Sequence, residues 1–367
     1  MKTKAAVLFE VGKEFEVVEL DLVKPKHGEV LVKVEAAGLC HSELHMLNGD
    51  LPVSLPMVGG HEATGIVEEI GPGVGKVKPG DRVVCTFVPS CGLCPYCSTG
   101  RQNLCVFGDQ PDGPLADGTF RFQLRGKDVG SFRQLGAFSE RLVTTERSVV
   151  RIDDTVAPDK AVLLSCGVPT GYGTATEAGR VGAGDTVVVF GIGGIGINAV
   201  QGASHAGAAN IVAVDPVQMK LDAARRFGAT HTFADAEPAL EKVREITAGE
   251  MADQALITVG NVDQEVVQHA QTAVGKSGVV VITGLASSTF EIRAVADWIL
   301  QRQVEIRGSI YGSMNPQTDI PRLLKLYQDG YLRLDGLVTA RYELEQVNQG
   351  YQDLRDGKNI RGILTFD

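Results

Sequence analysis

The chain has 367 residues, of which 44% are hydrophobic and 22% are charged, and its formal net charge is −10. The length exceeds the usual size of a single hydrophobic core, so we expect two domains in a globular protein. The acidic balance argues against a nucleic-acid partner. No apolar run approaches the roughly 18 residues that span a membrane, and Glu10 interrupts the apolar run near the start. We therefore expect no signal peptide, no membrane association and a cytoplasmic location.

The first part of the chain, from Lys4 to about Ile152, has the pattern of short strands. Val30, Val32 and Val34 recur with a period of two, which is typical of a half-buried strand. Further strands, separated by Gly/Pro turns, are predicted over Thr64–Ile70, Asp81–Val88, Phe138–Thr144 and Ser148–Ile152. Many short strands predict a partly closed β-barrel-like domain. The segment Gly108–Gly136, rich in Gly, Asp and Arg, is predicted to be irregular.

After Asp159 the pattern changes to strands that alternate with helices. A glycine-rich turn is predicted over Cys166–Gly173, followed by a helix over Thr174–Arg180. The predicted strands are Thr186–Phe190, Ile211–Asp215, Gln254–Thr258 and Gly278–Thr283, and the predicted helices include Val217–Phe227 and Ala239–Thr247. This alternation predicts a parallel sheet with helices on both faces.

The alternation ends near Tyr311. Apolar residues at helical spacing predict one helix through Ile320–Tyr327 and a second through Val347–Leu354 that ends at Gly357. A last strand is predicted over Gly362–Phe366.

A glycine-rich turn lies between two of the predicted strands. It contains Gly191, Gly193, Gly194, Ile195 and Gly196. Such glycines permit a tight turn, a close approach of backbone amides to a pyrophosphate, and close packing of a helix on a strand. An acidic residue that could accept from a ribose hydroxyl follows 19 residues after the last glycine, at Asp215. A lone glycine pattern is often only a turn, but the flanking strands and this acid predict a dinucleotide site.

Four of the seven cysteines, Cys91, Cys94, Cys97 and Cys105, fall within fifteen residues. Four thiolates on one loop can surround a tetrahedral ion and leave no open position, so we predict a structural zinc site. The alternative is a surface cysteine cluster without metal. An odd cysteine count without a secretory signal makes a disulfide framework improbable.

Three further residues, Cys40, His61 and Cys166, lie on separated loops. Two thiolates and one imidazole would hold a zinc ion with an open fourth position, which is the catalytic arrangement. From spacing alone, the alternative is that these residues are scattered through a core. The remaining cysteine, Cys85, lies in an apolar strand and is interpreted as a small core residue.

Together these stretches resemble the zinc-dependent medium-chain alcohol dehydrogenases, from Lys4 to Phe366. The resemblance is carried by Gly59–Gly65 (GGHEATG), the four-cysteine loop, Cys166–Gly173 (CGVPTGYG) and Gly191–Gly196 (GIGGIG). The segment after Cys105 resembles the long, liver-type branch. Within it, the actinobacterial nitrosoaniline-dependent alcohol dehydrogenases are resembled at Gly100–Cys105, Gly191–Ala203, Asp215–Val217 and Asn359–Gly362. This implies a nicotinamide cofactor that is held tightly and reoxidised in place.

The resemblance implies an α/β fold in which a Rossmann doubly wound parallel sheet is inserted into a GroES-like β-barrel catalytic domain. Residues 1–167 and 311–367 would form the catalytic domain, with a structural zinc lobe at 91–105, and residues 168–310 would bind NAD. It also implies two zinc ions per chain, one catalytic and one structural. We expect a homodimer or homotetramer, with a small redox carrier as a candidate electron acceptor.

The resemblance also assigns roles around the catalytic zinc, whose ligands match Cys40, His61 and Cys166. Ser42 matches the hydroxyl that binds the alcohol oxygen, and His45 matches the imidazole that passes the proton to solvent. Glu43 matches a carboxylate behind His61, where aspartate is usual, and Glu62 matches an acid near the metal. From the sequence, Ser42 has the alternative of a helix cap and His45 that of a surface helix residue.

Cofactor and substrate contacts are implied in the same way. Thr170 matches a residue against the nicotinamide ring, Asp215 and Lys220 match adenosine-ribose contacts, and Arg361 matches a pyrophosphate contact. His41 stands where arginine is common and should hold the pyrophosphate less firmly. Asp215 favours NAD over NADP by repelling a 2′-phosphate. The positions that match the substrate pocket are Leu51, Phe87, Leu135, Leu285 and Ile310.

The predicted function is zinc-dependent oxidation of primary, apolar alcohols to aldehydes with hydride transfer to NAD. Zinc makes the bound hydroxyl acidic, and the released proton leaves through Ser42 and His45. One alternative is a thiol-dependent formaldehyde dehydrogenase. A second, from another class, is a non-catalytic zinc- and nucleotide-binding protein, against which the complete ligand trio with Ser42 and His45 argues.

Overall fold

The computed structural model describes residues 1–108 and 113–366, and this part of the chain divides into two compact units. The first unit comprises Met1–Cys166, Asn315–Asp329 and Leu334–Asp367. The second comprises Gly167–Met314 and Gly330–Arg333. The domain limits predicted from the sequence fall after residues 167 and 310, and the main unit limits fall after Cys166 and Met314.

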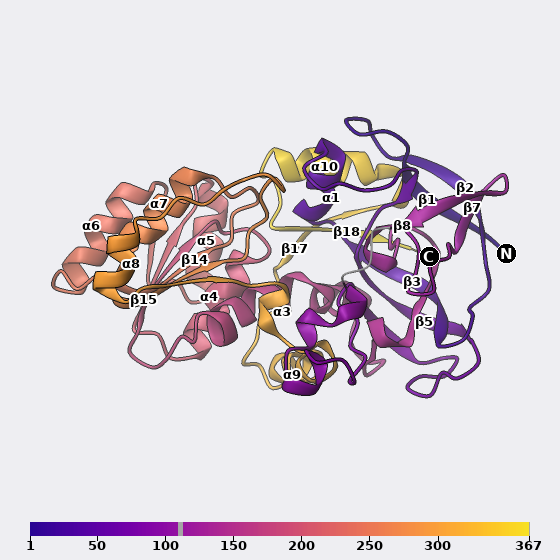
Figure 1. Cartoon of the computed structure of the whole chain (residues 1–367), viewed down its shortest axis with the longest axis horizontal. Helices are drawn as coiled ribbons and strands as arrows, with labels where there is room; N and C mark the ends of the chain where they lie inside the picture. The colour runs from indigo at the N-terminus through magenta and orange to yellow at the C-terminus, as the bar shows by residue number, and fades with distance from the viewer. Residues whose placement is uncertain (109–112, 367) are drawn as a thin grey trace. The chain divides into compact units, whose positions relative to one another are not determined.

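The first unit is built mainly from strands (Figure 1). Among its described residues a closed barrel is formed by β1 (Lys2–Leu8), β2 (Glu16–Leu22), β7 (Phe122–Leu124), β8 (Lys127–Ser131) and β4 (Met57–Val58). A larger sheet is formed by β10 (Val149–Arg151), β6 (Arg82–Thr86), β5 (Glu62–Ile70), β3 (Glu29–Gly38), β18 (Arg361–Thr365) and β17 (Val338–Tyr342), with β9 (Arg141–Thr145) beside β3. The predicted strands of this part are present with small shifts at their ends.

Strand register in the larger sheet positions two later loops. Ala37 of β3 pairs with Ala63 of β5 on one side and with Leu364 of β18 on the other. The chain that leaves β3 therefore starts beside the chain that enters β5. These two connections carry Cys40 and His61.

The prediction that Gly108–Gly136 is irregular is wrong for much of the segment. It contains β7 and β8, and the short helix η4 (Phe132–Gln134), while residues 109–112 lie outside the described part. The strands are only three and five residues long, too short to show alternation against their Gly-, Asp- and Arg-rich turns. Their apolar residues Phe122 and Val129 are fully buried in the core of the unit, and this burial fixes the strands.

Helices and short helical turns complete the first unit. The α-helices are α1 (His41–Asn48), α2 (Pro158–Ala161), α9 (Pro316–Gln328) and α10 (Val347–Arg355). The shorter turns are η1 (Cys97–Thr99), η2 (Gln102–Leu104), η3 (Val106–Gly108), η5 (Glu146–Ser148), η6 (Val162–Ser165) and η9 (Leu344–Gln346). α9 and α10 include the residues from which the sequence predicted two late helices.

The second unit contains a parallel sheet that is six-stranded in the described residues. Its order is β13 (His231–Phe233), β12 (Asn210–Val214), β11 (Thr186–Phe190), β14 (Ala252–Ile257), β15 (Val274–Ile282) and β16 (Glu305–Gly308). The helical segments are α3 (Gly167–Gly173), η7 (Thr174–Ala178), α4 (Gly196–His205), α5 (Gln218–Arg226), α6 (Ala236–Ile246), α7 (Gln264–Ala273), α8 (Ala296–Arg302) and η8 (Tyr311–Ser313).

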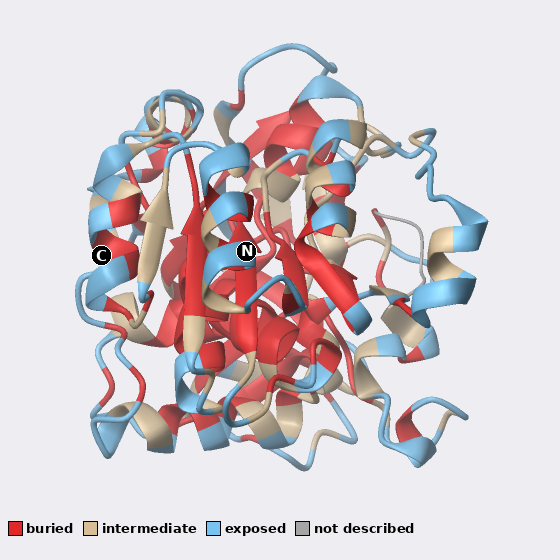
Figure 2. Cartoon of the chain, turned by 90° about the vertical axis from the view of Figure 1, so that its left-hand side faces the viewer, coloured by how far each residue is buried: buried red, intermediate tan, exposed pale blue. Residues whose placement is uncertain are grey.

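Helices cover both faces of this sheet, as the alternating pattern predicts. Val188 and Phe190 share one hydrophobic core with α6 and α7. Because side chains alternate along a strand, Val187 and Val189 point to the opposite face, where α4 contacts β11. Figure 2 shows the buried strands between helices whose outer turns are exposed. No helix in the described ranges is both long and apolar enough to cross a bilayer.

The prediction of a glycine-rich turn at Cys166–Gly173 is wrong, because residues 167–173 form α3. The glycines serve close packing instead. A Cβ atom at Gly171 would lie 2.0 Å from the carbonyl oxygen of Ile195, and one at Gly173 would lie 2.3 Å from that of Gly312. The helix predicted over Thr174–Arg180 is a π-helical turn, η7, that ends before Arg180, whose φ is +53°.

Candidate active site

Three separate connections of the first unit bring Cys40, His61 and Cys166 together. Cys40 lies between β3 and α1, His61 directly precedes β5, and Cys166 follows η6. All three side chains are buried. Their ligand atoms, with a carboxylate oxygen of Glu62, all lie within 4.8 Å of one another.

The two glycines that precede His61 allow its loop to reach this cluster. Gly60 has a φ of +88°, which favours glycine, and a Cβ atom there would lie 2.5 Å from the ring of Phe138. A Cβ atom at Gly59 would lie 2.7 Å from the ring of Phe15. The backbone of this loop therefore packs directly on two aromatic rings, and no larger residue fits at either position.

Glu43 of α1 holds the far side of the His61 ring. Its Oε1 lies 2.6 Å from His61 Nδ1, and both side chains are buried. With Nδ1 engaged by the carboxylate, Nε2 is left as the ligand atom. The extra methylene of glutamate thus does not prevent this contact.

Glu62 connects the cluster to Arg361. The Arg361 guanidinium pairs with Glu62 Oε2, and both groups are buried. A Cβ atom at Gly38 would overlap this pair, which explains the glycine at the end of β3. Glu62 Oε1 has no hydrogen-bond partner among the described residues and lies 3.9 Å from His61 Nε2. Burial raises the pKa of Glu62 to about 7.

The two sulfur atoms of the cluster interact directly. A hydrogen bond with Cys166, together with the nearby His61, holds the pKa of Cys40 well below its usual value. The same pairing, with burial, holds the pKa of Cys166 above its usual value. Two thiol groups and one oriented imidazole that converge in the interior fit a three-ligand zinc ion, and the unpaired carboxylate oxygen of Glu62 lies beside them.

Helix α1 also carries Ser42 and His45. Ser42 Oγ lies 3.6 Å from Cys40 Sγ. The alternative that Ser42 caps the helix is wrong, because the N-cap position is Cys40 and no side chain caps there. The surface alternative for His45 is also wrong, because His45 is only 4% exposed and its Nδ1 lies 3.0 Å from Asp50 Oδ2.

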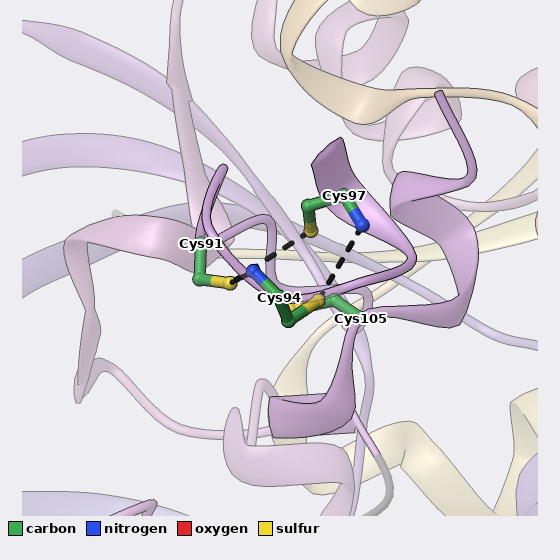
Figure 3. Close-up of side chains that lie close together, drawn as sticks. All are labelled: Cys91, Cys94, Cys97 and Cys105. Atoms are coloured by element: carbon green, nitrogen blue, oxygen red, sulfur yellow. Dashed lines mark hydrogen bonds between the residues drawn. The ribbon is translucent and has the colours of Figure 1, made fainter. Parts of the chain in front are cut away.

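The four clustered cysteines form a second candidate metal site within the described residues. Their sulfur atoms also lie within 4.8 Å of one another and face a common centre (Figure 3). Backbone N–H groups of Leu93 and Cys94 donate to Cys91 Sγ, and that of Cys97 donates to Cys94 Sγ. The last bond is the main reason why the pKa of Cys94 is lowered to about 6. A closed set of four sulfurs fits a structural zinc ion.

The glycine loop of the second unit joins β11 to α4. Gly191 has a φ of +90°, and a Cβ atom at Gly196 would lie 1.8 Å from the carbonyl oxygen of Gly191. A Cβ atom at Gly193, in contrast, would meet no described atom within 4 Å. The backbone at Gly193, next to Gly194 and Ile195, is therefore open to a ligand at the start of a helix.

Asp215, at the end of β12, holds this loop. Its Oδ2 accepts from the N–H of Ile192 at 2.8 Å, and its Oδ1 accepts from that of Val217 at 2.9 Å. Lys220 Nζ lies 3.7 Å from Oδ2. The carboxylate thus lies beside the loop that the sequence predicts to bind a dinucleotide.

The other predicted site residues are distributed over both units. In the first unit, the ring of Phe87 lies 5.2 Å from that of His61, Leu51 packs on the hydrophobic core, Leu135 is fully buried and His41 is half-buried. In the second unit, Thr170 is buried in α3, Leu285 is half-buried and Ile310 is 44% exposed. Their grouping into one pocket stays a prediction. Sequence reasoning missed Asp50, although an acid five residues after His45 was a signal.

Comparison with known proteins identifies the class. The model for the alcohol dehydrogenase GroES-like domain matches residues 26–154, and the zinc-binding dehydrogenase model matches residues 194–329. The chain belongs to the zinc-dependent medium-chain alcohol dehydrogenases. The predicted family resemblance and fold class are thereby confirmed.

Particular relatives narrow this assignment. The chain is 57% identical, over 99% of both chains, to the NDMA-dependent alcohol dehydrogenase of Amycolatopsis methanolica. It is also 57% identical, over 100% of both chains, to the putative alcohol dehydrogenase D of Mycobacterium tuberculosis. Among solved structures, benzyl alcohol dehydrogenase from Acinetobacter calcoaceticus is 31% identical over 100% of both chains, with a TM-score of 0.92.

Proposed function

We propose that this protein oxidises primary alcohols of apolar character to aldehydes, with NAD as the hydride acceptor. The observation that carries the proposal is the buried convergence of Cys40, His61 and Cys166 in a chain that belongs to the alcohol dehydrogenases. The similarity to a benzyl alcohol dehydrogenase over the whole chain supports an apolar substrate. Phe87 beside His61, with Leu51, Leu135, Leu285 and Ile310, are the proposed pocket residues.

Cys40, His61 and Cys166 would hold the catalytic zinc, and the four-cysteine loop the structural one. A zinc ion bound this way supplies Lewis acidity, which makes an alcohol hydroxyl acidic near neutral pH. Glu43 fixes the His61 ring from behind. Glu62, neutralised in part by Arg361, places a carboxylate oxygen next to the same ligands.

The proton of the alcohol needs a path from a buried site. Ser42 is the proposed first acceptor, because its hydroxyl lies beside Cys40 Sγ. His45, one turn further along α1, is the proposed group that passes the proton towards solvent. Asp50 engages its Nδ1 and thereby orients the ring.

The glycine loop is the proposed pyrophosphate site. Gly193, Gly194, Ile195 and Gly196 present backbone N–H groups at the start of α4, with space above Gly193. Asp215 is proposed to accept from the adenosine ribose and so to favour NAD over NADP. The further proposed cofactor contacts are His41, Thr170, Gly191, Lys220 and Arg361.

The electron acceptor is proposed from the NDMA-dependent relative. We infer that NAD stays bound between turnovers and is reoxidised in place by a small redox carrier. We also propose a homodimer or homotetramer of a cytoplasmic enzyme.

Two measurements test this proposal. Turnover of a panel of aliphatic and benzylic alcohols should be supported by NDMA, and the denatured protein should release about one nicotinamide nucleotide per chain. Absence of turnover with NDMA and with added NAD would contradict the enzyme assignment. Turnover with added NAD, without released nucleotide, would contradict only the bound cofactor. Formaldehyde oxidation that requires an added thiol would instead favour the thiol-dependent reaction.

A further inference from the structure

The carboxylate of Glu43 is anchored at only one of its two oxygens. Oε1 contacts His61 Nδ1, whereas Oε2 is buried and has no hydrogen-bond partner in the described part of the chain. A buried carboxylate oxygen without a donor is costly, and a glutamate side chain has three torsions to fix. Another group is therefore needed to hold Glu43 in the position that orients His61.

Tyr351 of α10 lies near the two loops that carry Cys40 and His61. Its ring centroid is 5.8 Å from that of Phe15 and 6.1 Å from that of Phe138, the two rings on which the Gly59–Gly60 turn is seated. One residue earlier in α10, a Cβ atom at Gly350 would lie 2.4 Å from Leu39, the neighbour of Cys40. α10 thus packs directly against the connection between β3 and α1, which carries Cys40.

The Tyr351 hydroxyl also has no hydrogen-bond partner among the described residues, although the side chain is 1% exposed. Burial, with the negative charges of Glu43 and Cys40, raises the pKa of this phenol well above its usual value. The hydroxyl therefore keeps its proton, and the Glu43 carboxylate lies close enough for its charge to affect the phenol. A buried donor and a buried acceptor, both unsatisfied, are adjacent.

We propose that Tyr351 is a positioning residue, whose hydroxyl donates to Glu43 Oε2 and thereby locks Glu43 against His61. The proposal rests on the proposed function, because His61 acts there as a zinc ligand. With both oxygens engaged, Glu43 keeps one rotamer, and the His61 ring keeps its Nε2 directed at the two sulfur atoms. Tyr351 thus acts on the metal through two intervening side chains.

The test is Tyr351→Phe in the zinc-loaded enzyme, followed by the rate at which a chelator removes each zinc. Partners behind a metal ligand typically change metal affinity by about 10- to 100-fold, so we expect the catalytic zinc to leave roughly 10-fold faster. Release of the four-cysteine zinc should not change. Tyr342→Phe is the matched control, because it also removes a phenol hydroxyl from the core of the first unit. That hydroxyl donates to Asp353 at 2.8 Å, and Asp353 contacts neither Glu43 nor His61 in any hydrogen bond of the described residues.

A second measurement keeps the proposal falsifiable if Tyr351→Phe is generally destabilising. In a Glu43→Ala background, adding Tyr351→Phe should change zinc release less than two-fold, because no carboxylate is left to position. Equal acceleration in Tyr342→Phe, unchanged release in Tyr351→Phe, or full additivity with Glu43→Ala would each overturn the proposal. If the wild-type protein holds only the four-cysteine zinc, the proposed function itself fails, which is a distinct result.

Discussion

His45 Nδ1 lies 3.0 Å from Asp50 Oδ2, and the backbone N–H of Asp50 donates to the carbonyl oxygen of His45 at 2.8 Å. Gly49, with a φ of +82°, ends α1 between them and lets the chain turn back. The end of the helix and the orientation of its imidazole are therefore set by one local turn. Two buried imidazoles of the first unit, His45 and His61, are thus each held at Nδ1 by a carboxylate.

The first prediction concerns this pair. Asp50→Asn should lower kcat for alcohol oxidation about 10-fold, because a general base contributes about 100-fold or more and the substitution disturbs its orientation without removing it. KM should change little. Steady-state kinetics across pH give the measurement. Asp356→Asn, at the end of α10, is the control, and an equal loss of kcat in both variants would contradict a role for Asp50.

Zinc content distinguishes the two metal sites. Cys40→Ala should abolish activity and leave one zinc per chain, because the four-cysteine loop shares no residue with the Cys40 cluster. Cys97→Ala should remove the other zinc and destabilise the first unit, since a structural zinc contributes folding energy. Metal analysis of the purified variants is the measurement. Loss of both metals from Cys40→Ala would show that the sites are not independent.

Cysteine reactivity should differ sharply along the chain after chelator treatment. The pKa of Cys94 is about 6, so about nine-tenths of it is thiolate at pH 7. Burial raises the pKa of Cys85 to about 12, so only about one part in 100,000 is thiolate. We expect peptide mapping to find Cys94 among the first residues alkylated by iodoacetamide and Cys85 among the last. Alkylation of Cys85 before Cys94 would contradict this assignment.

Acid stability should depend on Asp117. Although burial favours its protonated form, hydrogen bonds from Thr119 and Arg121 hold its pKa well below the usual 3.8. The stabilisation is therefore present above pH 3.8 and is lost as the pH falls further. Asp117→Asn should lower the free energy of unfolding at pH 7 by about 1 kcal/mol, a modest loss for a partly exposed pair. Denaturant titrations should show the difference narrowing below about pH 4, and a gap that is constant with pH would refute the account.

Asp215 has two separable effects. Asp215→Ala leaves the buried N–H group of Ile192 and the partly buried one of Val217 without acceptors, which should cost up to about 1–3 kcal/mol for each donor that stays unpaired. Asp215→Asn keeps one oxygen acceptor, so only one of the two N–H groups stays unpaired, and it removes the charge. Both variants should accept NADP better than the wild type, whereas Asp215→Ala should lose more thermal stability than Asp215→Asn. Unchanged coenzyme preference in both would mean that Asp215 does not face the ribose.

Much of the architecture could be predicted because its signals are local. The strand Thr186–Phe190 lies where the sequence placed it, and the helix predicted over Val217–Phe227 differs from α5 by one residue at each end. Apolar runs of this length next to glycine turns leave few alternatives. The short strands β7 and β8 could not be predicted, since pairing with distant residues decides them.

Glycine serves two different structural purposes in this chain. The glycines of Gly191–Gly196 form the expected loop, whereas those at Gly171 and Gly173 lie inside helix α3. A glycine is needed both where φ is positive and where another backbone approaches closely, and these cases look alike in one sequence. Only the packing of Gly171 on Ile195 and of Gly173 on Gly312 separates them.

By itself, the sequence determined the four-cysteine cluster and the sheet of the second unit, because cysteine spacing and strand–glycine–helix order are local. The class of protein and the trio of Cys40, His61 and Cys166 were indicated by the resemblance of whole motifs, since spacing alone left the trio open. Tertiary structure decided which contacts these side chains make. Glu43 meets His61, and is proposed to meet Tyr351, because strand register and helix packing bring these elements together, whereas Asp50 reaches His45 through a local turn. No pattern in the chain records which buried carboxylate oxygen lacks a donor, since that depends on side chains meeting across the core.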